Sequence, residues 1–241
     1  MNYIFDVDGT LTPSRGRIDQ DFEKFFLDFI KKHNVYLVTG SDYEKTEEQL
    51  GEEICNNVTY VFNCAGNSIR KNGTIVFEND WVLPQSARSW LLEKLDESKF
   101  YRKTGIHIEQ RPGMVNFSII GRNCNLEERA MYRQWDEHKN ERNLIAKEFQ
   151  EKFNLQADVA GETGIDIYPI GADKSQVIEW IEKPISFFGD KMQLGGNDYP
   201  LAKALELHVK CSSIQVKDWK DTQRMLWALE NVGVHEFVGV V

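Results

Sequence analysis

Short apolar runs alternate with amphipathic stretches from the N-terminus onward. The runs "NYIFDV", "VYLV" and "TYVF" are apolar, aromatic and β-branched, and each has the length of a buried strand. Residues 19–34 repeat phenylalanine at helical spacing, and a polar helix is expected from Asp42 to about Leu50. The order strand, helix, strand, helix, strand predicts a parallel sheet with right-handed crossovers.

The pattern changes after the third strand. The segment "SIRKNGTIVF" predicts a β-hairpin that turns at Asn72 and Gly73. Residues 82–169 then contain a helix over 85–97, two strands around a Pro-Gly turn, a charged helical stretch over 126–153 and two further strands. We interpret this segment as an α+β insertion.

The α/β pattern resumes after the insertion. Residues 173–183 predict a helix, "ISFFGD" predicts a strand, and the loop "KMQLGGND" leads to another helix and to the closing segment "SSIQVKDWKDTQRMLWALENV". The sequence therefore predicts an α/β protein. Its Rossmann-like parallel-sheet core spans residues 1–81 and 170–241, and an α+β domain over residues 82–169 is inserted into that core.

Composition and charge restrict the function. The 241 residues carry a net charge of -9 without a long cluster of lysine and arginine, which argues against a nucleic-acid or anionic-membrane surface. The four cysteines have the spacing of neither a zinc site nor a disulfide framework. No window approaches the roughly 18 apolar residues of a membrane span. We expect a cytoplasmic protein that binds neither nucleic acid nor membranes.

Two carboxylates follow the first predicted strand. Asp6 and Asp8 are two positions apart, so on a strand both side chains point to one side and are expected to converge. When two carboxylates lie so near each other, either the pKa of one of them rises or the pair binds a cation. Gly9 permits a tight turn, and the hydroxyls of Thr10 and Thr12 are donors for an anion. The stretch predicts Mg²⁺ with a phosphate, whereas the alternative is that the aspartates only cap a turn.

Complementary groups follow other strands of the predicted core. Ser41 follows the second strand, Lys174 lies at a helix start, and Asp190 ends a later strand with Asn197 and Asp198 close behind. Taken singly, Ser41 is interpreted as a helix cap, Lys174 as a surface lysine and Asp190 as a turn residue. Ligands of open α/β sheets bind beyond the carboxyl ends of the strands, so together these residues favour a site.

Four motifs follow one another along the chain: D-x-D-G-T-L-T, a hydroxyl, a lysine, and G-D followed by N-D. This set resembles the motifs of the haloacid dehalogenase superfamily of phosphoryl-transfer enzymes. The resemblance implies that Asp6 is the nucleophile and that Asp8 is the general acid and base. Ser41 and Lys174 would hold the transferring phosphoryl group, and Asp190 would bind Mg²⁺ together with Asp6 and the Asp8 carbonyl. The supporting residues would be Thr10, Gly40, Asn197 and Asp198.

Arginines gather in one part of the insertion. Arg111, Arg122 and Arg129 are spread over a predicted hairpin and the helix start that follows it. Arginine binds phosphate in a bidentate manner, so these residues suit a substrate that keeps a second phosphate. The alternative is three solvated arginines on an edge hairpin.

The resemblance narrows to the eukaryotic-type phosphomannomutases over nearly the whole chain. It rests on "FDVDGTLTPSRGRI", "GSDYEKTEEQLGEE", "QRPGMVNFSIIGRNC…EER", "GIDIYPIGADK" and "FFGDK…GGND". It implies interconversion of mannose 6-phosphate and mannose 1-phosphate, a hexose 1,6-bisphosphate primer, and a homodimer formed through the insertion, which is a mobile cap in that family. The residues implied to bind the phosphorylated sugar are Arg15, Arg111, Met114, Asn116, Arg122, Arg129 and Asp166.

The chain also departs from that family. Gly164 stands where the family usually has serine, Pro112 replaces a usual asparagine, "GADK" lacks the usual tryptophan, and the loop after "GGND" is shorter. These departures keep a sugar-phosphate phosphatase on the same scaffold as the second reading. A signalling receiver domain would have about half this length and no insertion. A catalytically silent binding module is disfavoured because Asp8 and Asp190 are both present.

Overall fold

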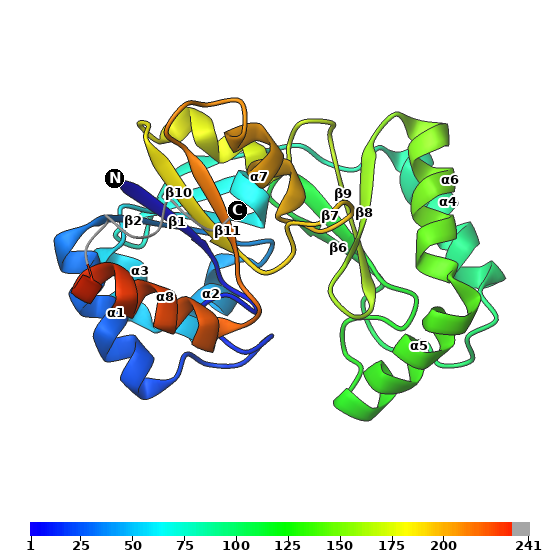
Figure 1. Ribbon diagram of the computed structural model, residues 1–241. Coiled ribbons are helices and arrows are strands. Elements are labelled where there is room, and N and C mark those ends of the chain that lie inside the picture. The colour runs from blue at the N-terminus through cyan, green and yellow to red at the C-terminus, as the bar shows by residue number, and fades with distance from the viewer. Residues whose placement is uncertain (233–241) are drawn as a thin grey trace. The chain divides into compact units, whose positions relative to one another are not determined.

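The computed structural model describes residues 1–232, and these fall into two compact units (Figure 1). The core unit comprises Met1–Val76 and the chain from Lys174 onward, and the insertion unit comprises Phe77–Asp173. The predicted insertion over residues 82–169 lies within the second unit. Of the predicted core, residues 233–241 lie outside the described residues.

The core unit is built on a seven-stranded sheet of strand order β11-β10-β1-β2-β3-β4-β5. The strands β11, β10, β1, β2 and β3 pair in parallel, and β4 pairs antiparallel with β3. The bounds are β1 (Asn2–Asp6), β2 (Asn34–Val38), β3 (Tyr60–Asn63), β4 (Ser68–Lys71), β5 (Thr74–Glu78), β10 (Ile185–Gly189) and β11 (Ser212–Gln215). The predicted α/β fold class is confirmed.

Both faces of the central strands are covered, as a parallel sheet requires. On β1, Tyr3 and Phe5 enter one apolar cluster and Ile4 enters another. The first cluster includes side chains of α1 (Gln20–Lys32), α2 (Tyr43–Leu50), α3 (Glu52–Asn57) and α8 (Trp219–Val232). The second includes η2, a 3₁₀ helix (Lys174–Trp180), and α7 (Tyr199–Leu205). Figure 1 shows α1, α3 and α8 together on one face of this sheet.

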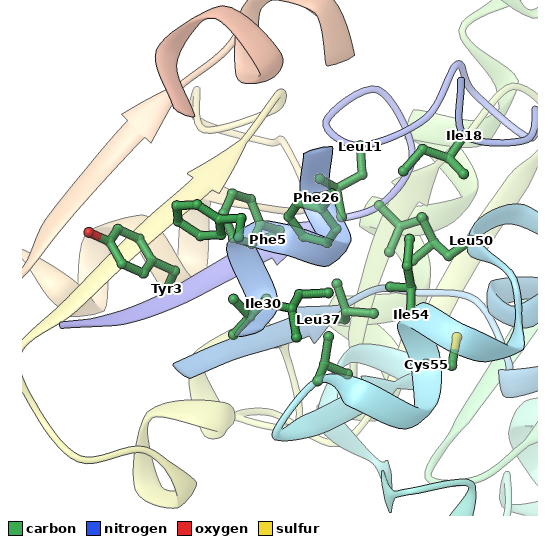
Figure 2. Close-up of a cluster of buried hydrophobic side chains, with 14 of the residues drawn as sticks. Tyr3, Phe5, Leu11, Ile18, Phe26, Ile30, Leu37, Leu50, Ile54 and Cys55 are labelled. Atoms are coloured by element: carbon green, nitrogen blue, oxygen red, sulfur yellow. The ribbon is translucent and has the colours of Figure 1, made fainter. Parts of the chain in front are cut away.

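Aromatic packing fixes α1 against the sheet. Figure 2 shows Phe5, Phe26, Ile30 and Leu37 converging in one cluster, and the ring centroids of Phe5 and Phe26 are 5.2 Å apart. Full burial of each such side chain contributes roughly 1.5–3 kcal/mol. The helix begins at an Asp19 cap whose side chain accepts hydrogen bonds from two backbone N–H groups. This packing and the cap together position α1 against β1, the strand whose carboxyl end leads into the Asp6 loop.

The insertion unit is a four-stranded antiparallel sheet with helices on one face. The strand order is β6-β7-β9-β8, with β6 (Ile108–Arg111), β7 (Met114–Phe117), β8 (Gln156–Ala160) and β9 (Gly164–Tyr168). One face of this sheet, which includes Val115, Phe117 and Ile167, packs on α4 (Gln85–Glu97), α5 (Leu126–Lys139) and α6 (Glu141–Phe153). The opposite face carries polar side chains at alternate positions, as the two-residue period of a strand dictates.

Two helix predictions need correction. The charged stretch predicted as one helix over 126–153 is two helices, because Asn140 adopts a left-handed conformation with φ 55° and ends α5. The helix predicted over 173–183 is the 3₁₀ helix η2, which is shorter. The short 3₁₀ turn η1 (Cys64–Gly66) and α3 were not predicted. None of the helices in the described part of the chain combines the length and apolar character needed to cross a membrane.

Candidate active site

The loop after β1 is folded tightly around one carbonyl. Val7 O accepts hydrogen bonds from the backbone N–H groups of Thr10, Leu11 and Thr12, at 3.3, 2.9 and 3.1 Å. Gly9 has φ +87°, and a Cβ on it would lie 2.5 Å from Asp190 Oδ2. Glycine is therefore required both for the backbone conformation and for the close approach of Asp190. The Thr10 hydroxyl is buried and has no hydrogen-bond partner among the described residues.

Lys174 is buried between two carboxylates. Its Nζ donates to Asp6 Oδ1 at 2.6 Å and to Asp198 Oδ1 at 2.7 Å, and only 2% of its side-chain surface is exposed. The reading of Lys174 as a surface lysine is therefore wrong. Burial alone would lower the pKa of this lysine, but the carboxylates of Asp198 and Asp6 raise it, so the ammonium keeps its charge.

Three carboxylates lie together at this site, and Lys191 Nζ lies 3.9 Å from Asp190 Oδ2. Carboxylate oxygens of Asp6, Asp190 and Asp198 all lie within 4.8 Å of one another. The pKa of Asp6 is raised to about 8: burial is the largest cause, Asp198 and Asp190 also raise it, and Lys174 lowers it. Asp6 Oδ2 and Asp190 Oδ1 are buried without a hydrogen-bond partner among the described residues.

These observations fit a divalent ion. The three carboxylates outnumber the buried ammonium of Lys174 and the exposed ammonium of Lys191, and unpartnered carboxylate oxygens are the hard ligands that Mg²⁺ prefers. Asp6 and Asp190 offer the two unpartnered oxygens. Both oxygens of Asp198 are engaged, because Oδ1 accepts from Lys174 and Oδ2 accepts from the Lys191 backbone N–H at 3.0 Å. The sequence predicts Asp198 only as a supporting residue, but the structure places it in the carboxylate group itself. Asn197, the neighbouring predicted supporting residue, is exposed.

Asp8 lies beyond the end of β1 and has its own hydrogen-bond partners. The strand ends at Asp6, and the Asp8 carboxylate accepts hydrogen bonds from the Arg15 backbone N–H at 2.6 Å and from Gln49 Nε2 at 3.0 Å. Gln49 also donates to Thr12 Oγ1 at 3.2 Å. Gln49 was not predicted, because nothing in the sequence distinguishes it from the other polar residues of α2. The Asp8 side chain is outside the three-carboxylate group, and metal binding by its carbonyl stays a prediction.

Ser41 lies in the loop after β2, next to Gly40. The helix cap is Asp42, whose side chain accepts from Lys45 N at 2.9 Å, so the reading of Ser41 as a cap is wrong. Ser41 O accepts hydrogen bonds from the Cys64 backbone N–H at 3.0 Å and from Asn63 Nδ2 at 3.3 Å. The end of β3 therefore holds the backbone of the predicted phosphoryl-binding loop.

The polar face of the insertion sheet carries the predicted sugar-binding residues. Met114, Asn116 and Arg111 share this face with Asp166, and Asn116 lies directly opposite Asp166, donating to its Oδ1 at 2.6 Å. Burial raises the pKa of Asp166, while Arg111, the Asn116 hydrogen bond and Arg122 lower it. The two arginine charges therefore act on the same carboxylate.

The three predicted arginines are paired rather than solvated. Arg111 donates to Glu109 Oε2, and Arg122 Nε lies 3.3 Å from the same oxygen. Arg129 is almost fully buried and instead contacts Glu162 Oε2 at 3.4 Å. The structure thus brings Arg111 and Arg122 together and gives Arg129 a different carboxylate. Glu109 and Glu162 were not predicted, because sequence patterns do not show which acid pairs with which arginine.

Solved structures resemble this fold at low sequence identity. A Plasmodium falciparum IMP-nucleotidase matches with a TM-score of 0.65 and 16% identity, over 97% of this chain and 71% of that chain. A trehalose-6-phosphate phosphatase related protein matches with a TM-score of 0.56 and 18% identity, over 97% and 99%. These similarities show that the chain shares the fold of those proteins.

Relatives of known family are closer in sequence. A phosphomannomutase of Dendrobium officinale is 37% identical over 82% of this chain and 83% of its own length. A phosphomannomutase of Drosophila melanogaster is 35% identical over 92% of both chains. The family model for eukaryotic phosphomannomutase matches residues 22–231. The chain belongs to the eukaryotic phosphomannomutase family.

Proposed function

We propose that this chain is a phosphomannomutase that interconverts mannose 6-phosphate and mannose 1-phosphate through an aspartyl-phosphate on Asp6. Family membership supports the reaction. The observation that carries the chemistry is the buried Lys174, which lies between Asp6 and Asp198 within 2.7 Å of both. A buried lysine on a carboxylate that has one unpartnered oxygen is the arrangement that phosphoryl transfer to that carboxylate needs.

A magnesium ion is part of the proposal. Asp6 and Asp190 would hold it through their unpartnered oxygens, with Asp198 beside them and the Asp8 carbonyl as the further predicted ligand. When bound, Mg²⁺ would neutralise charge on the phosphoryl oxygens. The remaining chemistry belongs to side chains of this chain.

The proposed transfer takes place in two steps, phosphorylation of Asp6 and transfer of the phosphoryl group from Asp6 to a sugar hydroxyl. An Asp6 oxygen bonds to phosphorus while the bond from phosphorus to the sugar oxygen breaks, and that oxygen keeps the electron pair and takes a proton from Asp8. Another sugar hydroxyl then attacks the phosphoaspartate and gives its proton to Asp8, which regenerates Asp6. The hydrogen bonds that Asp8 accepts from Gln49 and the Arg15 N–H both engage its Oδ1, so its Oδ2 would carry the proton. Lys174 and Ser41 bind the phosphoryl oxygens.

The insertion supplies the other half of substrate binding in this proposal. Arg111, Arg122 and Arg129 would bind the phosphate that does not react, and Met114, Asn116 and Asp166 would line the sugar, with Arg15 contributed by the core. Residues 82–169 would then act as the cap of a catalytic core. The proposal also includes the hexose 1,6-bisphosphate primer, a homodimer formed through the cap and a cytoplasmic location, which the family resemblance implies.

The proposal is tested by following both products. The protein is incubated with Mg²⁺, mannose 1-phosphate and a trace of hexose 1,6-bisphosphate, and mannose 6-phosphate and free phosphate are measured together. We expect isomer in large excess over phosphate, and Asp6→Asn should lose roughly 10⁴-fold or more of the rate, as enzymes do when a nucleophile is removed. Stoichiometric phosphate without isomer would show a sugar-phosphate phosphatase, the reading to which Gly164 points.

A further inference from the structure

A row of polar side chains crosses the whole insertion sheet. Glu109 on β6 lies opposite Asn116 on β7, Asn116 lies opposite Asp166 on β9, and Asp166 lies opposite Asp158 on β8. Directly opposite residues have Cβ atoms about 4.5–5.5 Å apart and point to the same face. The row therefore extends past the predicted sugar-binding residues to Asp158, a carboxylate to which neither the sequence motifs nor the proposed function gives a role.

Asp158 is held in place by two donors. Gln156 Nε2 donates to its Oδ1 at 2.7 Å, and the Tyr168 hydroxyl donates to its Oδ2. Burial raises the pKa of Tyr168, and Asp158 raises it further, so the hydroxyl keeps the proton that it donates. Tyr168 is buried, whereas Asp158 and Asp166 are partly exposed. A buried hydroxyl and a partly exposed amide thus orient a carboxylate that solutes can still reach.

Both carboxylates retain acceptor capacity. A carboxylate accepts about four hydrogen bonds. Among the described residues, Gln156 and Tyr168 donate to Asp158, and Asn116 donates to Asp166. Like charges directly opposite each other on adjacent strands are destabilising, so such a pair costs stability unless a ligand or a neighbouring charge compensates for it. The pair can accept hydrogen bonds from neighbouring hydroxyl groups of one ligand.

A second observation points to a ligand here. Asn116 is only 5% exposed, its Nδ2 is turned to Asp166, and its Oδ1 has no hydrogen-bond partner among the described residues. An orphaned polar atom in a buried side chain is uncommon and calls for a partner. The group of carboxylates close enough to share a metal ion, within the described residues, is in the core unit and does not include Asp158. A neutral donor such as a sugar hydroxyl therefore suits this row better than a cation.

We infer that Asp158 is a specificity-determining residue, which accepts a hydrogen bond from one ring hydroxyl of the sugar phosphate beside the hydroxyl bound by Asp166. This inference rests on the proposed function, because it takes a phosphorylated sugar as the ligand. Glu109 and its two arginines lie at one end of the row and Asp158 lies at the other. In this arrangement the arginines at one end of the row would bind the charged phosphate of the ligand, and Asp158 at the other end would bind one of its hydroxyl groups.

A hydroxyl scan tests this role. Mannose 1-phosphate and its monodeoxy analogues, each lacking one ring hydroxyl, are compared on the wild type and on Asp158→Asn. We expect Asp158→Asn to lose about 10- to 100-fold in kcat/KM on mannose 1-phosphate and almost nothing on one analogue, the one that lacks the partner hydroxyl. Tyr168→Phe keeps the carboxylate but removes a donor that orients it, and should show a smaller loss with the same hydroxyl dependence.

The matched control is Asp96→Asn, the same change at an exposed position on α4, which covers the other face of the sheet. An equal loss on every analogue, in Asp158→Asn and in Tyr168→Phe, would overturn the inference, because a structural role affects all substrates alike. Total product and calorimetric binding are both recorded, so the scan can be read whether the ester is isomerised or hydrolysed. Absence of isomer counts against the proposed function, and absence of a hydroxyl-specific loss counts against Asp158.

Discussion

The two units differ in how far the charges of their predicted sites are compensated. In the core unit Asp6, Asp190 and Asp198 gather beside the buried ammonium of Lys174 and the exposed ammonium of Lys191, and two carboxylate oxygens have no hydrogen-bond partner among the described residues. In the insertion unit each predicted arginine already contacts a carboxylate, with Arg111 and Arg122 on Glu109 and Arg129 on Glu162. The core site lacks positive charge, whereas the insertion site is already compensated.

This difference decides how each site accepts a ligand. A cation that binds in the core adds to the existing contacts and relieves repulsion between buried carboxylates. An anion that binds the insertion arginines competes with Glu109 for Arg111 and Arg122 and with Glu162 for Arg129, so part of its binding energy is offset. Removal of a ligand group should therefore have a large effect in the core and a moderate effect in the insertion.

The largest effect is expected at Asp190. Asp190→Asn removes one of the two unpartnered carboxylate oxygens, so Mg²⁺-dependent activity should be lost. In thermal unfolding, Mg²⁺ at 100 times its Kd should stabilise the EDTA-treated wild type by about 2.7 kcal/mol and the variant far less. Asp28→Asn, an exposed change on α1, is the control. An undiminished Mg²⁺ shift in Asp190→Asn would contradict the proposed ion site.

The same experiment has a pH dependence. Burial, with Asp198 and Asp190 and against Lys174, raises the pKa of Asp6 to about 8 from a usual value of 3.8. Between those values the metal-free folded protein holds a proton that the unfolded chain releases, so this group makes stability fall as the pH rises. A bound cation replaces that proton, and the Mg²⁺ shift in unfolding temperature should be larger at pH 8 than at pH 6. A shift that is equal at both values would contradict the linkage.

A smaller effect is expected at Arg122. Arg122→Ala should raise KM for mannose 1-phosphate roughly 10- to 100-fold, because a charge-assisted contact contributes about 1.5–3 kcal/mol. Hydrolysis of acetyl phosphate should change little, since that small ester has no second phosphate. Arg102→Ala, which removes a half-exposed arginine paired with Glu128, is the control. If both substrates were affected equally, Arg122 would not bind a distal phosphate.

The sequence predicts the core site better than the insertion site, for a physical reason. Asp6, Ser41 and Asp190 follow strands of one sheet, and the carboxyl ends of parallel strands meet at one edge. Contacts such as Gln49 with Asp8 and Glu109 with Arg111 depend instead on loop course and side-chain orientation, which periodicity does not encode.

The helix boundary at Asn140 has a similar explanation. The charged pattern continues through it without glycine or proline, and only the left-handed backbone there ends the helix. Asp198 is another case, because its place beside Lys174 follows from the course of the loop after β10. A single side chain that folds back is therefore less predictable than one that ends a strand.

The smallest effect is expected at Gly164, and it tests how tightly the insertion row fits. A Cβ at this position would lie 2.5 Å from Asn116 Nδ2, so Gly164→Ser forces the amide away from Asp166 and breaks the 2.6 Å hydrogen bond. Loss of that bond should raise KM for the sugar phosphate about five- to tenfold, equivalent to about 1–1.4 kcal/mol.

The control for Gly164→Ser is Ala160→Ser, since Ala160 lies opposite Gly164 on β8 and already carries a Cβ. In an Asn116→Ala background the clash is absent, so Gly164→Ser should then be nearly neutral, and the two changes should not be additive. Tighter binding by Gly164→Ser would instead mean that the new hydroxyl reaches the ligand while Asn116 gives way. In that case the insertion row, like the core, would gain affinity from an added group, and the contrast between the two sites would fail at this position.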